Sequence, residues 1–420
     1  MNRTLSIVQL PTRHWPGLDR RHRERLGSLG RQTFMGRRFV ASLVLGLGGA
    51  LAVTGCGPVG PAAIPTRAGN TWQEIRDSPL SPRSAAVGVW TGREVLLIGG
   101  RDGELCPPNA LCLRDGTPLA DGAALDPRTG KWRRIADAPV PLGGAAAAVV
   151  GQTAYFLPHT PDPAAAATAL AYEVDQNRWH WLPVPFGSAD HYGLVAAGDQ
   201  LVAHVTSDEA RTGADFIFHP GTATWRALPP DPLGKLAERS IVWTGAELAL
   251  FGTDPAADPG TNRPPVVRAA LLDLATGSWR ELSHSTMVSI APWIVVDGSL
   301  VNTAVRGADG DLGSAYPNGG RLDPVTGRWS SLPDLPDGIE HVAGAFTAST
   351  AIYFGVQGAV LDTTADRWLR LPVIPDDGGN SHTIVAAGTD LVAFGGVDWT
   401  SEVKVELSNS TWIWAPPTTA

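Results

Sequence analysis

Short apolar runs separated by turn-forming residues recur along most of this chain. One stretch shows the order: Ser240-Ile-Val-Trp243, a turn at Thr244-Gly245, Glu247-Leu-Ala-Leu-Phe251, a long polar loop, Arg268-Ala-Ala-Leu-Leu272 and a last run at Trp279. Apolar and aromatic runs bounded by Gly, Asp, Asn and Pro are typical of strands in hairpins. We therefore predict units of four antiparallel strands.

A phrase near the end of each unit repeats along the sequence. Asp126-Pro-Arg-Thr-Gly-Lys-Trp132 returns as Asp273-Leu-Ala-Thr-Gly-Ser-Trp279 and as Asp323-Pro-Val-Thr-Gly-Arg-Trp329. The whole series is Trp72, Trp132, Trp179, Trp225, Trp279, Trp329, Trp368 and Trp412, with gaps of 60, 47, 46, 54, 50, 39 and 44 residues. A period of roughly 40–50 residues is typical of a repeat architecture.

The residue types in the phrase have local structural reasons. A turn Asp accepts hydrogen bonds from backbone N–H groups two or three residues on, and the Gly of Thr-Gly supplies a positive φ. An aliphatic residue follows seven of the Trp at a spacing of three: Ile75, Ile135, Leu182, Leu228, Leu282, Leu332 and Leu371. In a strand this odd spacing puts the two side chains on opposite faces, so we expect both faces of each sheet to be covered.

Radially arranged four-stranded sheets meet that requirement and leave only short edges. We therefore predict an all-β fold, a seven-bladed β-propeller over residues 70–420, with six blades as the alternative. Strands near Trp72 and Trp412 are expected to meet in the last blade and close the ring.

The units also resemble kelch repeats. The resemblance is carried by the glycine pairs Gly99-Gly100 and Gly395-Gly396 after a second strand, followed by a loop, an Asp turn and Trp. It covers roughly residues 70–415 and implies a kelch-type propeller of the galactose oxidase kind of fold. Quinoprotein propellers, which also carry an Asp…Thr-Gly…Trp phrase, are the second resemblance.

The segment 35–55 has the features of a lipoprotein signal peptide. Arg37-Arg38 is followed by an apolar stretch of 15 residues, Phe39–Val53, which is short for a membrane span of about 20 residues. The segment ends in Val53-Thr-Gly-Cys56, which resembles a lipobox, and this resemblance implies lipidation of Cys56. An ordinary secretion signal followed by an incidental Cys is the alternative.

These features set the expected organisation of the chain. Residues 1–34 are expected to be disordered or a non-native upstream extension, with translation starting at Met35. Residues 56–69 read as a flexible tether rich in Pro, Gly and Ala. We expect an extracytoplasmic protein that is anchored to the bacterial cell membrane through its lipid.

Charge and cysteine usage narrow the possible partners. From Cys56 onward the net charge is about −15, which repels phosphate backbones, so we expect no nucleic-acid partner. Cys106 and Cys112 lie in one loop and are predicted to form a disulfide in an oxidising compartment. A metal site is the competing interpretation, but no second Cys pair or His cluster is near in sequence. We expect no metal, no cofactor and a monomer.

Charged residues recur where the first strand of several units begins. In antiparallel units these positions share one face with the long variable loops, where binding usually occurs. The candidate funnel residues are Arg83, Asp190, His191, Glu238, Arg239, Glu340, His341 and His382. Converging on the propeller axis, they would bind a polar ligand such as a sugar. The alternative is ordinary solvated strand ends.

We predict a non-enzymatic binding module for a protein or a cell-envelope glycan, because no nucleophile elbow, phosphate loop or metal-ligand spacing is present. The alternative is a carbohydrate-active enzyme, such as a sugar mutarotase or epimerase, with funnel carboxylates and histidines as acid and base. That alternative rests on a resemblance to kelch-like sialic-acid mutarotases. The resemblance to galactose oxidase is confined to the fold, because that family needs a Cys cross-linked to Tyr.

Overall fold

The computed structural model divides the chain into two units, 1–62 and 63–420, and the residues that it describes all lie in the second. The described ranges are 69–104, 116–158, 167–188, 191–206, 213–253, 266–287, 293–296, 298–302, 320–333, 343–346, 350–354, 358–362, 366–375, 379–380, 382–399 and 405–416. The predicted segments 1–34 and 35–55, and nearly all of the tether, lie outside them.

Within these ranges the strands form seven four-stranded antiparallel sheets, each ordered from an inner strand outward. The first contains β2 (Val87–Trp90), β3 (Val95–Ile98), β6 (Gly122–Asp126) and β7 (Lys131–Ile135). The second contains β8 (Ala146–Val150), β9 (Thr153–Leu157), β10 (Thr168–Glu173) and β11 (Arg178–Pro183). The third contains β12 (Tyr192–Ala197), β13 (Gln200–Val205), β14 (Phe216–His219) and β15 (Thr224–Ala227).

The remaining sheets follow the same order. The fourth contains β16 (Ala237–Trp243), β17 (Leu248–Thr253), β18 (Val267–Asp273) and β19 (Ser278–Glu281). The fifth contains β20 (Trp293–Val296), β21 (Ser299–Asn302), β22 (Gly320–Leu322) and β23 (Trp329–Ser331). The sixth, whose side chains are described mainly in its outer strand, contains β24 (Ala343–Phe346), β25 (Thr350–Phe354), β26 (Gly358–Asp362) and β27 (Arg367–Leu371).

The last sheet joins the two ends of this unit. It contains β29 (Thr383–Ala387), β30 (Asp390–Phe394), β33 (Thr411–Trp414) and, as its outer strand, β1 (Trp72–Glu74). Small additions are β4 (Arg101–Asp102) with β5 (Thr117–Pro118), and β28 (Gly379–Asn380) with β31 (Val397–Trp399) and β32 (Val405–Leu407). Trp72 pairs with Trp414, and Glu74 with Trp412. The predicted meeting of the terminal strands is confirmed, but Trp412 lies in a third strand and is not an eighth outer-strand Trp.

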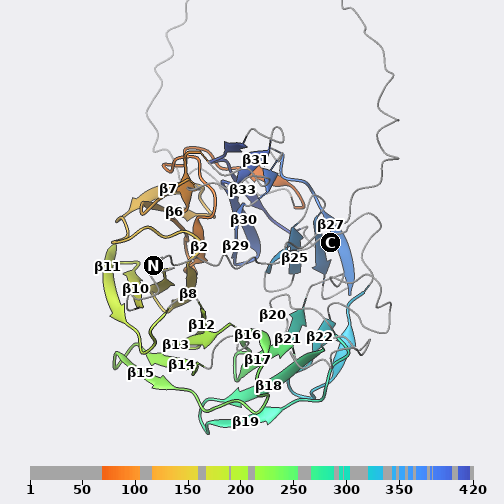
Figure 1. Cartoon of the computed structure of the whole chain (residues 1–420). Helices are drawn as coiled ribbons and strands as arrows, with labels where there is room; N and C mark the ends of the chain where they lie inside the picture. Colours follow the sequence, from red (N-terminus) through yellow and green to blue (C-terminus); the bar gives the residue numbers. More distant parts are fainter. Residues whose placement is uncertain are drawn as a thin grey trace, which may run out of the picture. The chain divides into compact units, whose positions relative to one another are not determined.

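The sheets follow one another around a ring, with the first strand of each nearest the centre (Figure 1). Contacts between inner strands link β29 to β2, β2 to β8, β8 to β12, β12 to β16, β16 to β20, and β24 to β29. An ion pair between Arg321 and Asp366 connects the fifth sheet with the sixth. The all-β propeller predicted from the repeat is therefore confirmed. In the described part of the chain, no helix has the length and apolar character needed to cross a membrane.

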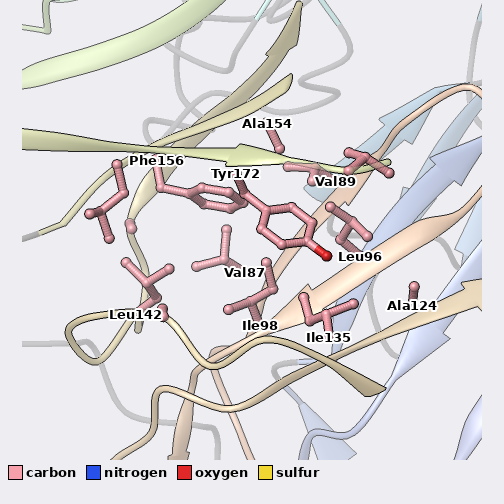
Figure 2. Packing of buried hydrophobic residues seen from close by; sticks show 14 residues of the cluster. Val87, Val89, Leu96, Ile98, Ala124, Ile135, Leu142, Ala154, Phe156 and Tyr172 are labelled. Atoms are coloured by element: carbon pink, nitrogen blue, oxygen red, sulfur yellow. The ribbon is translucent and has the colours of Figure 1, made fainter. Parts of the chain in front are cut away.

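Side chains of the inner strands pack sideways between neighbouring sheets. In β8, Ala147 and Val149 pack with the first sheet, whereas Ala148 packs with the third. Figure 2 shows the cluster between the first two sheets, where Val87 and Ile98 face Phe156 and Tyr172. This alternation follows from the period of two in a strand. Among the described residues it buries apolar surface in six interfaces between neighbouring sheets, so no single central core is needed.

The Trp and the aliphatic residue of each unit serve opposite interfaces, as predicted. Trp279 packs in the cluster shared with the third sheet, and Leu282 in the cluster shared with the fifth. Likewise, Trp225 packs toward the second sheet and Leu228 toward the fourth. The phrase that repeats in the sequence therefore encodes the stacking of the sheets.

Six Trp of the series make one hydrogen bond that recurs around the ring. The indole Nε1 donates to a backbone carbonyl oxygen four residues after the preceding outer-strand Trp. The acceptors are Ala136 for Trp179 (2.8 Å), Pro183 for Trp225 (2.9 Å), Pro229 for Trp279 (3.0 Å), Ser283 for Trp329 (2.9 Å), Pro333 for Trp368 (2.8 Å) and Pro372 for Trp72 (2.8 Å). The Nε1 of Trp132 has no partner among the described residues. Six of the seven interfaces thus share one polar link.

The Asp of the phrase holds its own turn, also as predicted. Oδ1 of Asp273 accepts hydrogen bonds from the N–H groups of Ala275 (2.8 Å) and Thr276 (3.3 Å). The N–H of Gly277, at φ 71°, donates to the carbonyl of Asp273 at 2.8 Å. Equivalent bonds form at Asp126 and Asp323. These carboxylates are structural, because turn N–H groups occupy them.

The paired glycines are explained by close approach to the next link. Gly99 and Gly100 have φ of 67° and 93°. A Cβ on Gly99 would lie 1.6 Å from the carbonyl oxygen of Leu142, in the link to the second sheet. A Cβ on Gly395 would lie 2.6 Å from the carbonyl oxygen of Arg83, and a Cβ on Gly396 would lie 2.6 Å from Nδ1 of His382. The N–H of Gly396 also donates to the Arg83 carbonyl at 3.0 Å. Only glycine fits such positions.

The Trp link can be tested at Trp279. We expect Trp279→Phe to lower the free energy of unfolding by about 1–2 kcal/mol, because the Pro229 carbonyl loses its donor. The matched control is Trp181→Phe. That side chain is exposed and makes none of the hydrogen bonds found among the described residues, so the change should stay within about 0.5 kcal/mol. Urea unfolding followed by circular dichroism measures both, and equal effects would contradict the role of the link.

Candidate functional site

Arg83, a predicted funnel residue, is a buried brace between strands. Its side chain is 1% exposed. Nη1 and Nη2 bind both oxygens of Asp121 at 2.7 and 3.0 Å, and Nη1 also donates to the carbonyl of Gly99 at 3.1 Å. Nε and Nη2 donate to the carbonyl and hydroxyl of Ser81 at 3.0 and 2.8 Å. All three of its nitrogens therefore have protein partners, as a buried guanidinium requires.

Arg239 forms a second brace, between the third and fourth sheets. Its side chain is 2% exposed and binds Asp215 at 2.8 Å and Asp231 at 3.1 Å. Nη1 also donates to the carbonyl of Val205 at 3.3 Å. Asp215 in turn accepts from the backbone N–H of Val205 at 2.8 Å. One guanidinium with two carboxylates ties β13, the start of β14 and the link before β16 together.

A buried histidine and a half-buried tyrosine lie beside this brace. His204 of β13 packs over Gly193, where a Cβ would lie 2.5 Å from Nε2. Burial lowers the pKa of His204, although Asp215 acts in the opposite direction, so the ring is neutral at pH 7. Tyr192 donates to the carbonyl of Ala214 at 3.0 Å. Burial raises the pKa of Tyr192, with a smaller contribution from Asp215.

The predicted acid–cation pair at Glu238 and Arg239 is split by the backbone. Glu238 is exposed and has φ of 52°, and a β-bulge lies between Ala237 and Ser240. The arginine side chain points inward, while the glutamate stays at the surface. Ala85 and Gly144 have the same left-handed conformation at the equivalent positions of the first two sheets, with φ of 52° and 65°. The left-handed conformation of Glu238 is therefore a backbone feature that several units share.

The other described candidates lie at two separate places. Nδ1 of His382 is within hydrogen-bond distance of the Gly395 carbonyl, next to the backbone contact made by Arg83. The backbone carbonyl of His191 accepts from the N–H of Thr206 at 2.8 Å. The structure thus brings Arg83 and His382 to one junction of neighbouring sheets, and places His191 and Arg239 near another.

Several predicted residues lie outside the described residues. These are Asp190, Glu340, His341, Cys56, Cys106 and Cys112. The predicted lipidation and the predicted disulfide therefore stay predictions. Within the described ranges no group of three or more His, Cys, Asp and Glu side chains could hold a metal ion.

Sequence reasoning missed the acidic partners of the two arginines. Asp121, Asp215 and Asp231 lie in links or just before third strands, at positions that carry no repeated phrase.

A repeated sequence signal does exist for a second type of ion pair. Glu94 and Glu247 both end a Thr-Gly-x-Glu turn, and they pair with Arg133 (2.6 Å) and Arg280 (3.3 Å), each directly after a series Trp. The hydrogen bonds from Arg133 lower the pKa of Glu94 despite its burial.

The chemistry of the described region is that of a braced scaffold. The buried arginines Arg83 and Arg239 are held in fixed ion pairs, and the candidates Glu238, His191 and His382 lie at the long-loop end of the inner strands. This arrangement can hold loops in place and offer a few polar groups to a ligand.

Comparison with known proteins adds no family. No protein-family model and no curated protein matches this chain.

The brace at Asp121 predicts a specific pH dependence. Hydrogen bonds from Arg83 lower the pKa of Asp121, against the opposing effect of burial. Because the folded-state pKa is depressed, its stabilisation is present above the unfolded value of about 4 and is lost as pH falls through the folded pKa. At pH 7 we expect Asp121→Asn to cost about 1.5–3 kcal/mol, the usual contribution of hydrogen bonds to a charged group.

The difference in free energy of unfolding between wild type and Asp121→Asn should become smaller as pH falls below about 4, because the amide does not titrate. Urea unfolding at pH 7, 5 and 3.5 measures this difference. The control is Asp175→Asn, since that side chain is 60% exposed and a surface pair contributes less than about 1 kcal/mol. A difference in free energy of unfolding between wild type and Asp121→Asn that stays the same at all three pH values would refute the stabilising role of the ionised Asp121.

Proposed function

We propose that this protein is a lipid-anchored, extracytoplasmic propeller of the kelch-like type, which binds a protein or a cell-envelope glycan through its long-loop face. In this proposal each of the seven sheets is one blade. The observation that carries the proposal is the sorting of connections by strand direction.

Strand register supports one loop-bearing face. The pairs Ile98–Gly122, Ala203–Phe216, Thr253–Val267 and Asn302–Gly320 close the second and third strands of four sheets at the same end. Between them run connections of many residues. The opposite end carries the short turns Thr91–Glu94, Gly151–Gln152, Gly198–Asp199 and Thr244–Glu247. Long variable connections on a rigid scaffold are where binding concentrates.

The buried braces support a binding role for this face. Arg83 and Arg239 are held by carboxylates, so their charge fixes the roots of the connections. His191, Glu238 and His382 are the described polar candidates at that end. The acidic surface favours partners without clustered negative charge. Lipidation at Cys56 would keep the domain near the membrane, within reach of envelope components.

The binding face can be tested by shortening connections. We expect replacement of residues 254–265 or 303–319 by a short Gly-Ser linker to reduce ligand capture at least tenfold while the melting temperature changes little, because the flanking strands β17 and β18, or β21 and β22, are kept. The probes are native membrane extracts and a panel of envelope glycans. A Gly198–Asp199 turn replaced by Asn-Gly is the matched control.

Equal ligand capture by the wild type and all shortened variants would contradict the proposal that the long-loop face binds the ligand. Turnover of a sugar probe that depends on Glu238 or His382 would instead establish the enzyme alternative.

The anchor is tested separately with Cys56→Ser. We expect this change to abolish metabolic labelling with a radioactive fatty acid and to move the protein from the membrane fraction to the soluble fraction. The thiol is the group that would carry the lipid, so Ser cannot replace it. Cys106→Ser is the control and should leave fractionation unchanged. Persistent labelling of Cys56→Ser would exclude Cys56 as the lipid site.

A further inference from the structure

One outer-strand position differs between the second sheet and all the others. The residue two places after the series Trp is exposed in every outer strand. In six strands it is small or polar: Glu74, Arg134, Ala227, Glu281, Ser331 and Arg370. In β11 it is Trp181, which is 54% exposed. The second sheet therefore carries a large aromatic side chain at a position that is exposed in every outer strand and small or polar in the other six.

Trp181 has no structural task in the described part of the chain. None of the side-chain hydrogen bonds or ring contacts found there involves its indole. Trp179, two residues earlier, shows the contrast: its Nε1 donates to the Ala136 carbonyl at 2.8 Å, and its ring packs against Tyr172 at 4.8 Å. An indole that is not needed for packing leaves a large apolar face open to a ligand.

The surroundings of Trp181 include an exposed strand edge. β11 is the outer strand of its sheet, so no described strand pairs with its outer edge. Arg178 and His180 form a partly exposed network with Glu173, at 3.1 and 3.0 Å, but alternate residues of a strand point to opposite faces, so this network lies on the face opposite to Trp181. Pro183 and Pro185 continue the exposed positions beyond Trp181.

We propose that Trp181 is the stacking platform of a glycan subsite on the outer rim of the second sheet. A sugar ring presents a face of C–H groups that fits the electron-rich face of an indole, while its hydroxyls need hydrogen-bonding groups at the side. Trp181 offers the first, and the backbone N–H and C=O groups along the outer edge of β11, which no described strand pairs, offer the second. The subsite lies on an outer strand, apart from the inner-strand residues. It rests on the proposed binding function and extends it by naming a ligand class.

The size and charge of the surface favour a neutral glycan over a protein. A stable protein interface needs about 800 Å² on each partner with an apolar centre. The exposed large hydrophobic residues of the described region are Trp181, Val325 and Val373, which belong to different sheets and links. One isolated aromatic side chain suits one sugar ring. The net charge of about −15 from Cys56 onward disfavours acidic polysaccharides.

The test is a titration of the 57–420 fragment with neutral oligosaccharides of glucose, mannose, galactose or N-acetylglucosamine. We expect at least one series to shift the indole N–H resonance of Trp181, which is identified by its absence in Trp181→Phe. Trp181→Ala should weaken binding roughly tenfold, as expected for loss of one stacked ring, whereas Trp181→Phe should retain most of it. Val373→Ala, another exposed apolar residue, is the matched control.

The possible results separate this inference from the proposed function. Glycan binding that is unchanged in Trp181→Ala overturns the rim subsite but leaves the loop-face function intact. Capture of a protein partner with no response to any oligosaccharide also overturns the subsite. If neither glycans nor membrane extracts yield a ligand, the proposed function fails as well. Loss of binding in both Trp181→Ala and Val373→Ala would mean that the effect is not specific to stacking, which also contradicts the inference.

Discussion

The hydrogen bond from a Trp indole to a carbonyl of the preceding link is the interaction on which the ring depends most. It forms at six interfaces, always to the residue four positions after the preceding outer-strand Trp. Each bond alone contributes about 1 kcal/mol. Its importance is geometric, since a bulky side chain with a single donor fixes both the distance and the angle between neighbouring sheets. An interface of apolar contacts alone would leave the sheets free to slide.

Ring closure follows from the same link. Trp72, in the N-terminal outer strand, donates to Pro372 and so joins the sixth sheet to the last. Strand pairing of Trp72 with Trp414 completes the last sheet from both ends of the domain. The interface at Trp132 lacks the indole bond among the described residues, but Arg83 and the Gly395-Gly396 pair tie the first and last sheets together through backbone bonds. Backbone hydrogen bonds thus connect the two sheets at the one interface without the indole bond.

The sequence predicts those features that repeat. The Asp turns, the two-sided packing of Trp and aliphatic residues, and the closure by terminal strands all follow from spacing and residue type, and the structure confirms them. The roles of Arg83 and Arg239 could not be predicted in this way. Their partners Asp121, Asp215 and Asp231 lie 8 to 38 residues away in non-repeating links, so charge at a strand start is equally compatible with a solvated end, a ligand site and a buried brace.

Repetition also separates structural residues from candidates for function, but departure from the repeat is not sufficient by itself. Arg239 and Trp181 both depart from what other units carry at the same position. Arg239 is buried and bound by two carboxylates, so its departure is explained by packing. Trp181 is exposed, and the side-chain hydrogen bonds and ring contacts of the described residues leave its indole out. Packing in the described region therefore gives no reason for its size. Burial separates the departures that packing explains, such as Arg239, from those that leave a side chain open to a ligand, such as Trp181.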